Sequence, residues 1–168
     1  MALVLSGDAG ITFPVTAGSA SAVQASSGRV LQVVSAAFTS TFSTTSTSDT
    51  ASGLSASITP SSSSSKIFIS FTGITATANL AAYWGAFSIY RNGSTRLAGG
   101  QAGVVGTSNS TFRVQSALSY LDSPATTSST TYEIYLKSEG NSSTVSLNIP
   151  AGVVSDPKST ITLMEIAA

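Results

Sequence analysis

Short runs of alternating apolar and polar residues follow one another along most of this chain. Between Leu54 and Phe71, two such runs flank Pro60 and a serine tract, Ser61 to Ser65. Their apolar positions, spaced by two residues, are Leu54, Ala56 and Ile58 in the first run and Ile67, Ile69 and Phe71 in the second. A period of two is typical of a half-buried strand, and proline ends a strand because it has no N–H. The stretch predicts strand, polar connection, strand, with the serine tract as a passive connection.

The same alternation predicts about nine or ten strands. Asn92-Gly93 between two runs is a strong hairpin signal, because both residues tolerate the positive φ of a type I′ turn. The loop that follows the return strand is expected from Gly99 to Asn109. Gly140-Asn141 predicts a second hairpin, joining the run at Tyr132 to the run at Val145. With no apolar spacing typical of helices, the pattern indicates an all-β sandwich, jelly roll or barrel, and we expect an antiparallel β-sandwich of jelly-roll type.

The first 27 residues differ from the rest, because they are rich in glycine, alanine and serine. We expect residues 1–27 to form an N-terminal arm and residues 28–168 to form the β-sandwich domain. Short apolar clusters in the arm could pair as small strands around Gly7, Asp8 and Gly10. The arm is either flexible or a segment that docks on a partner. The candidate docking residues are Leu3, Val4, Leu5, Ile11 and Phe13.

The last run, from Ser159 to Ala168, is apolar on both faces. Ile161 and Leu163 share one face, whereas Met164 and Ile166 belong to the alternation on the other. A strand that is apolar on both faces is usually covered on both. We therefore predict a subunit interface at Leu163, Met164 and Ile166.

Charge is scarce, and this excludes several function classes. Seven basic residues balance seven acidic ones, and charged residues make up 8% of the chain, against about a quarter in ordinary soluble proteins. The basic residues are scattered, so nucleic-acid binding is not expected. No run of eighteen apolar residues occurs, so membrane insertion is not expected either. The start has no positive region or long apolar run typical of a signal peptide. A net charge of zero favours self-association.

Candidate chemistry is sparse. The chain has no histidine and no cysteine, which removes the usual general base, the usual zinc ligands and any Ser-His-Asp arrangement. We expect no cofactor and no enzymatic activity; a carboxylate-pair glycosidase is the only enzyme class that the composition leaves open. A calcium site at Asp8 or Asp156 stays open beside the reading of both as solvated turn residues. Three N-glycosylation patterns, beginning at Asn92, Asn109 and Asn141, are better explained as turn composition.

One aromatic group could contact a ligand. Tyr83, Trp84 and Tyr90 lie in a single predicted strand beside the Asn92-Gly93 turn. Exposed aromatic side chains of this kind stack on sugars or anchor protein interfaces. The alternative is that they pack in the core or at a subunit seam, because tryptophan is highly buried on average.

The residues GLSASITPSSSSSKIFISF, preceded by RVLQVVSAAF and followed at the C-terminal end by TITLMEIA, resemble small structural proteins of tailed bacteriophages, notably of marine and cyanobacterial phages. The opening LVLSGDAGITFP is similar to the start of many phage fibre proteins. The resemblance covers most of the chain. It implies a short attachment segment and a β-sandwich head, often trimeric, similar in outline to the heads of complement C1q and tumour necrosis factor. One departure is that the chain has no repeats typical of a fibre shaft.

These observations give three hypotheses. The first is a trimeric, fibre-like, non-enzymatic protein of a tailed-phage virion, made in the host cytoplasm and attached by its arm to other virion proteins, with loops that contact a host-surface glycan. The second is a capsid decoration, or cement, protein that stabilises the shell by binding across subunits. The third is a carbohydrate-binding module.

Overall fold

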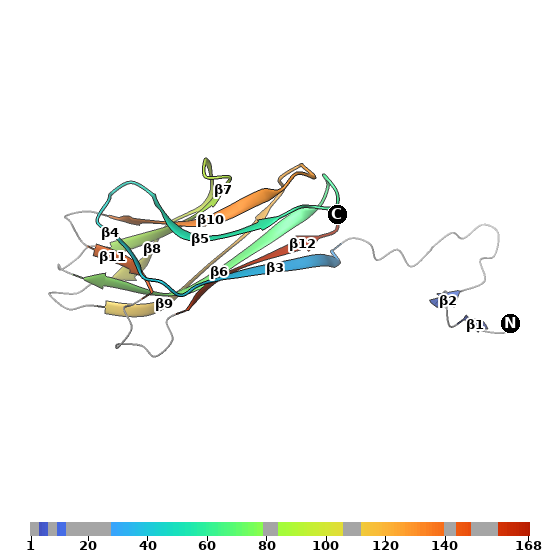
Figure 1. The fold of residues 1–168 in the computed structure, drawn as a ribbon, viewed down its shortest axis with the longest axis horizontal. Helices are drawn as coiled ribbons and strands as arrows, with labels where there is room; N and C mark the ends of the chain where they lie inside the picture. The colour runs from blue at the N-terminus through green and yellow to red at the C-terminus, as the bar shows by residue number, and fades with distance from the viewer. Residues whose placement is uncertain are drawn as a thin grey trace.

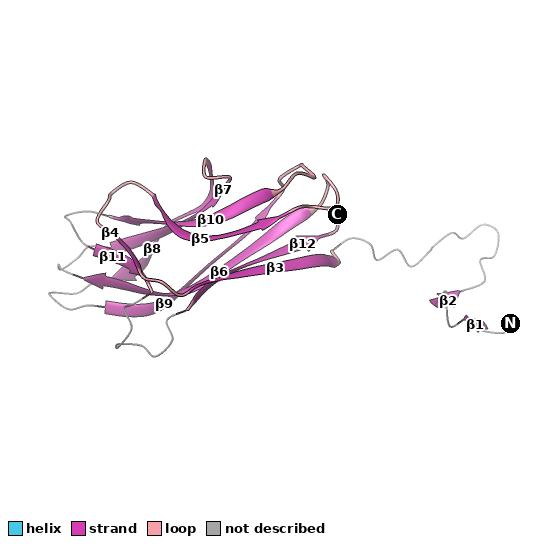
Figure 2. Ribbon diagram, in the orientation of Figure 1, coloured by secondary structure: helices cyan, strands magenta, loops and turns pink. Residues whose placement is uncertain are grey.

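The computed structural model describes residues 4–6, 10–12, 28–78, 84–105, 112–139, 144–148 and 158–168 (Figure 1). Within them, side chains are described for residues 28–74, 85–99, 115–139, 144–148 and 158–168. All regular structure in these residues is β-strand, with no helix (Figure 2). No helix that could span a membrane therefore occurs in this part of the chain.

Twelve strands are assigned in the described residues, ten of them from Val30 onwards. They are β1 (Val4–Ser6), β2 (Gly10–Thr12), β3 (Val30–Phe38), β4 (Phe42–Thr44), β5 (Thr50–Ile58), β6 (Lys66–Ala78), β7 (Trp84–Arg91), β8 (Thr95–Val105), β9 (Phe112–Asp122), β10 (Thr130–Ser138), β11 (Thr144–Leu147) and β12 (Ser159–Ile166). β1 and β2 form a separate antiparallel pair.

Two antiparallel sheets form the sandwich, and they lie as layers in Figure 1. The smaller sheet has the order β5-β10-β7-β8. In the larger sheet, β9 pairs along one edge of the long strand β6. The other edge of β6 pairs first with β12 and then with β11, and these carry β3 and β4 in turn. Both layers are therefore four strands wide.

The strand pairs are nested along the chain. β3 pairs with β12, β5 with β10, β6 with β9 and β7 with β8, and successive pairs alternate between the two sheets. Nesting of this kind is a long antiparallel ribbon rolled into a sandwich, which is the jelly-roll arrangement. The predicted all-β, antiparallel sandwich fold is confirmed.

The core lies between the sheets and is built from the alternating positions that the sequence indicated. Its fully buried side chains include Leu54, Ile58, Ile67, Ile69, Phe71, Ile89, Tyr132, Ile134, Leu136, Leu147, Ile161 and Leu163. The rings of Phe71 and Phe87, from opposite sheets, stack with centroids 5.7 Å apart. The outward positions between these residues are mostly polar or small, as a half-buried strand requires, with Phe68 and Tyr135 as exceptions.

The predicted hairpin at Asn92-Gly93 is confirmed. Both residues have positive φ, 50° and 65°, and the N–H of Ser94 donates to the carbonyl of Arg91 at 3.3 Å. The return strand β8, however, runs on to Val105 through residues that we expected to form a loop. Register shifts along the β7–β8 pair, together with a φ of 132° at Gly99, accommodate these glycine-rich residues in the ladder.

The predicted hairpin between β10 and β11 is wrong. β11 pairs with β6 and β4, and so belongs to the larger sheet, whereas β10 belongs to the smaller one. Asn148, which is buried at the end of β11 with a φ of 58°, fixes this end of the strand in the larger sheet. Its amide donates to the carbonyls of Phe38 and Ser40 at 2.7 and 2.9 Å, and it accepts from the Ser159 hydroxyl at 2.7 Å.

A buried polar cluster joins the two sheets at one end. Asp122 of β9 accepts two hydrogen bonds from Arg91 of β7, at 3.0 and 2.9 Å, and one from the Tyr132 hydroxyl of β10 at 2.8 Å. Burial, and then the hydrogen bond to Asp122, raise the pKa of Tyr132. Because each buried polar group has a partner, the cluster ties the layers together without leaving a charge unpaired.

Candidate interaction surfaces

The outer side of the larger sheet carries no charged side chain over three adjacent rows. Each row crosses β3, β12, β6 and β9 in that order, because residues that pair across antiparallel strands lie on the same side of the sheet. The rows are Val33, Met164, Phe68 and Leu121; then Ser35, Thr162, Ser70 and Ser119; then Ala37, Thr160, Thr72 and Ala117. We call these twelve residues the uncharged face.

One end of the uncharged face is apolar and exposed. Val33 and Leu121 are 57% and 46% exposed, and Met164 and Phe68 between them are half-buried. A register shift between Glu165 and Ile166 inserts an extra residue into β3, so that Val30 and Leu31 are both exposed, at 48% and 37%. Among the described side chains, the exposed large hydrophobic residues lie on β3 and β9 alone. Clustered exposure of this kind marks an interaction surface.

The rest of the uncharged face is small and hydroxylated. Ser35 and Thr162 lie with their hydroxyl oxygens 3.2 Å apart, and those of Thr72 and Thr160 are 3.0 Å apart. Hydroxyls that already bond each other across strands need little from water. This part of the face can therefore meet another protein surface at a low desolvation cost.

The predicted interface residues of β12 fall on opposite sides of the sheet. Met164 and Ile166 point outwards and are half-buried, with Met164 inside the apolar row. Leu163 is 0% exposed and packs in the core of its own sandwich, so it cannot contact a second subunit. The alternation of β12 decides this, because Leu163 has the same parity as the buried Ile161.

The serine tract is not a passive connection. The Glu165 carboxylate, which is fully buried beside it, accepts from the backbone N–H and the hydroxyl of Ser61 at 2.7 and 2.6 Å, and from the Gln32 amide at 2.7 Å. Burial alone would raise the pKa of Glu165, but the hydrogen bonds from Ser61, Gln32 and Ser65 outweigh it and lower the pKa to about 2. The tract thus holds an ionised carboxylate at the apolar end of the larger sheet.

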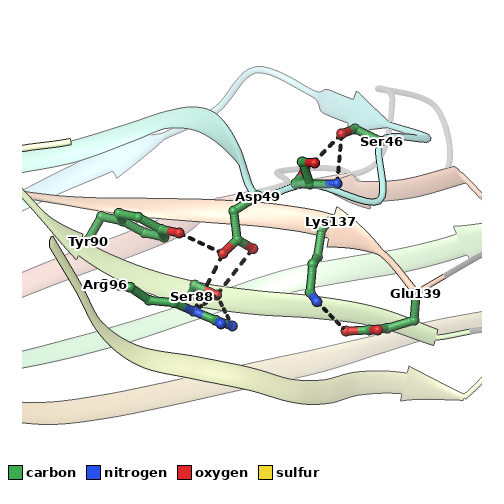
Figure 3. Close-up of polar contacts among 8 residues, drawn as sticks. Ser46, Asp49, Ser88, Tyr90, Arg96, Lys137 and Glu139 are labelled. Carbon is green, nitrogen blue, oxygen red and sulfur yellow. Dashed lines mark hydrogen bonds and ion pairs between the residues drawn. The ribbon is translucent and has the colours of Figure 1, made fainter. Parts of the chain in front are cut away.

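The outer side of the smaller sheet is charged instead. Figure 3 shows the Asp49 carboxylate between Tyr90 of β7 and Arg96 of β8. The Tyr90 hydroxyl donates to Asp49 at 2.7 Å, and the Arg96 guanidinium donates to the buried Ser88 hydroxyl at 3.1 and 2.9 Å. The Arg96 Nε lies 3.4 Å from Asp49 Oδ2, with the arginine side chain 40% exposed. We call Asp49, Ser88, Tyr90 and Arg96 the Asp49 cluster.

The three predicted ligand-contact residues have different outcomes. Tyr83 lies outside the described residues, and Trp84 begins β7 with a side chain that is not described. Tyr90 points outwards and stacks against Tyr135 of β10, with ring centroids 4.1 Å apart. Burial and the hydrogen bond to Asp49 raise the pKa of Tyr90. The sequence did not reveal Asp49 or Tyr135 as neighbours of Tyr90, because they come from distant segments.

The structure describes only some of the remaining predicted site residues. In the arm, Leu5 pairs with Ile11 in the β1–β2 ladder, which also includes Val4, whereas Leu3 and Phe13 lie outside the described residues. Asp8 and Asp156 also lie outside them. Across the described part of the chain, no group of three or more acidic residues is arranged to hold a metal ion. Two carboxylates that the sequence did not single out, Asp122 and Glu165, are buried and hydrogen-bonded.

Comparisons with known proteins give a distant likeness only. No protein-family model and no curated protein matches the chain. A structure of infectious bursal disease virus, Gx strain, is 14% identical, with 84% of this chain and 37% of that chain covered and a TM-score of 0.41. A mutant VP2 protein of the same virus, from T=1 particles, is 16% identical, with 99% and 44% covered and a TM-score of 0.39. The chain spans less than half the length of these viral proteins, and TM-scores this low assign it to no family.

Proposed function

We propose that this chain is a non-enzymatic structural protein on the surface of a tailed-phage virion, where it forms a fibre-like homotrimer attached by its arm, residues 1–27. The observation that carries the proposal is the uncharged face with its exposed apolar row. A sheet face that exposes Val33 and Leu121 and carries no charge is unfavourable in water and favourable against another subunit.

The distribution of charge supports the same reading. The outer side of the smaller sheet carries Asp49 and Arg96, together with Glu133 and Lys137 on β10. Charged side chains are depleted at the centres of protein interfaces and common on surfaces that stay in water. On the larger sheet, Lys66 lies on the outer side beside the apolar end, but the uncharged face itself has no charge. The uncharged face is therefore the side that faces other subunits, and the smaller sheet is the side that faces outwards.

The resemblance to tailed-phage structural proteins supports the location on a virion. The nested strand pairs agree with the β-sandwich head that this resemblance implies. The likeness to infectious bursal disease virus structures, at TM-scores of 0.41 and below, carries no weight here.

The arm leaves the sandwich beside the apolar end of the uncharged face. The N–H of Gly28 donates to the carbonyl of Ala167 at 2.8 Å, and the N–H of Ala167 donates to that of Arg29 at 2.9 Å. The root of the arm is thus fixed to the end of β12, next to Ile166. Attachment through Val4, Leu5 and Ile11 would tether this end of the sandwich to the virion.

The amount of the chain in a purified virion, measured by quantitative mass spectrometry, tests the location. A few to tens of copies per particle support a tail fibre, whereas hundreds support the capsid decoration protein, our alternative. Absence from the particle would overturn both. Particles grown with a variant that lacks residues 1–27 should lose the protein, since the arm is the proposed attachment; full retention would contradict that role.

A second role, contact with a host-surface glycan, is favoured by the Asp49 cluster and its stacked tyrosines. Tyr90 and Tyr135 form a joined aromatic surface, flanked by the carboxylate of Asp49 and the partly exposed guanidinium of Arg96. Aromatic faces with adjacent donors and acceptors suit the apolar and hydroxyl sides of a sugar ring. The same feature supports the third hypothesis, a carbohydrate-binding module, which would bind the glycan without being part of a virion.

Binding of the intact protein to purified host-surface polysaccharide, measured by calorimetry, tests this role. Replacing Tyr90 by Ala removes both the stacked ring and the hydrogen bond to Asp49, so affinity should fall by about tenfold or more. Lys137→Ala is the matched control, because Lys137 lies on the same sheet and pairs with Glu139 at 2.9 Å, outside the cluster. Equal binding by wild type and Tyr90→Ala would contradict the role.

A further inference from the structure

The exposed apolar residues of the larger sheet lie at its two opposite margins. The β3 margin carries Val30, Leu31 and Val33, and the β9 margin carries Tyr120 and Leu121. The half-buried Met164 and Phe68 connect the two margins through the apolar row. β3 and β9 are also the outer strands of this layer, with one paired edge each among the described residues.

A second copy of this chain is the occupant that these margins fit. The three rows and four strands of the uncharged face cover roughly 19 Å by 20 Å, or about 400 Å², from strand spacings of about 4.8 Å and row spacings of about 6.8 Å. A standard interface needs about 800 Å² from each partner. Contact through the face alone therefore falls short, whereas contact that also uses the margins adds three exposed side chains outside the face, Val30, Leu31 and Tyr120.

The two margins differ, and together with the area this decides the symmetry of the contact. A twofold contact of face against face would set β3 of each copy over β9 of the other, but it is limited to about 400 Å² from each partner, half of a standard interface. A twofold contact that pairs β3 margins leaves the β9 margin of both copies in water, and a contact that pairs β9 margins leaves the β3 margin exposed. A head-to-tail contact between a β3 margin and a β9 margin covers both on every copy once the ring closes. It also covers two sheet edges that could otherwise pair with other chains.

We infer that the β3 margin of one copy contacts the β9 margin of the next, so that copies close head-to-tail into a ring around a rotation axis. The inference rests on the proposed self-association and adds which surfaces meet. Val33 of one copy then lies near Leu121 of its neighbour. In a trimer, each copy makes two such contacts, one through each margin.

Cysteine cross-linking tests this arrangement. Because the chain has no cysteine of its own, only the introduced cysteines can react. Val33→Cys and Leu121→Cys each replace an exposed side chain, so both variants should fold. We expect neither variant alone to give a cross-linked dimer with a short bis-maleimide. Co-expression of the two with distinguishable tags should give a mixed dimer, and the double variant on one chain should give a ladder that stops at the closed ring.

The control pair is Thr95→Cys with Leu121→Cys, since Thr95 is exposed on the smaller sheet. This pair should give no cross-linked species. Ser35→Cys with Ser119→Cys, one row further along the uncharged face, is a second test pair if the first variants fail to fold.

The possible outcomes are distinct. Efficient cross-linking of a single variant to itself would overturn the head-to-tail contact in favour of a twofold one that pairs like margins. A double-variant ladder that stops at the dimer would overturn it in favour of a twofold contact of face against face. A wild-type oligomer in light scattering without a mixed cross-link in either test pair would overturn the inference while leaving the proposed function intact. A monomeric wild type would overturn both.

Discussion

Glu165 is buried with uncharged donors around it. The Ser61 hydroxyl and N–H and the Gln32 amide come from segments more than a hundred residues away in sequence. Contacts between such distant residues leave no pattern in local sequence spacing. The sequence therefore did not indicate them, and the serine tract was predicted to be a passive connection. Asp122 is similar, because its partners Arg91 and Tyr132 meet it only across the two sheets.

The hydrogen bonds at Glu165 predict a loss of stability in acid. The pKa of Glu165 is about 2 in the folded chain against an ordinary value of 4.5. Because the folded value is the lower one, this stabilisation is fully present above about pH 4.5 and is lost as pH falls towards 2. Thermal unfolding between pH 2 and pH 7 should show wild-type stability falling over this range.

The Glu165→Gln variant is the control for that prediction. It cannot ionise, and its amide nitrogen meets donors where an oxygen accepted, so it should be less stable than wild type by roughly 1–3 kcal/mol at pH 7. The difference between the two proteins should shrink as the pH approaches 2. A constant difference at every pH would contradict the assignment of the acid effect to this carboxylate.

Met164 offers a single-residue test of self-association. Its side chain lies in the middle of the apolar row and outside the core. Met164→Asp should leave the sandwich folded but weaken assembly by about 100-fold or more, because an unpaired charge would be buried between subunits. Sedimentation velocity at several concentrations measures this. Thr95→Asp on the smaller sheet should assemble like wild type, and unchanged assembly of Met164→Asp would contradict the proposed interface.

At the scale of elements, the period-two pattern predicted most strands and the core, because burial on one face of a sheet imposes alternation directly on the sequence. The runs around Ile58, Ile69 and Ile134 are clear cases. The pairing of β11 was not predictable in this way. Its apolar residues Val145 and Leu147 fit either sheet, and long-range contacts through Asn148 decide between them.

For strand β8, part of the chain that was expected to be a loop is a strand. Its glycine-rich second half has a composition typical of loops, but pairing with β7 holds it in the sheet with several register shifts. Glycine weakens a strand without excluding one, and a neighbouring strand supplies the hydrogen bonds that composition does not indicate.

The placement of β11 in the larger sheet should depend on the Asn148 side chain. Asn148→Ala removes two donated hydrogen bonds and one accepted one from a buried site, and we expect a loss of roughly 2–4 kcal/mol in unfolding free energy. Asn148→Gly suits the positive φ of this position without strain. Chemical denaturation of both variants separates the loss of the hydrogen bonds from backbone strain at the positive φ. A stability of Asn148→Gly close to wild type would contradict the role of the hydrogen bonds.

At the scale of the whole molecule, the two outer surfaces of the sandwich differ in kind. The larger sheet shows three rows of apolar, hydroxyl and small side chains, with Lys66 just beyond them, whereas the smaller sheet carries the Asp49 cluster, Glu133 and Lys137. The net charge of zero predicted self-association, but the sequence did not indicate on which surfaces the few charges lie. Their placement needs the strand pairing, since it depends on which side of each strand faces the core.

Self-association through the uncharged face is the central claim, and the molar mass of the purified wild-type protein tests it most directly. Light scattering after size exclusion, at neutral pH and moderate salt, should give about three times the 16.9 kDa mass of one chain. Because the contact is apolar, raising the salt concentration should not lower this value. A stable mass of 16.9 kDa at all protein concentrations would contradict the account.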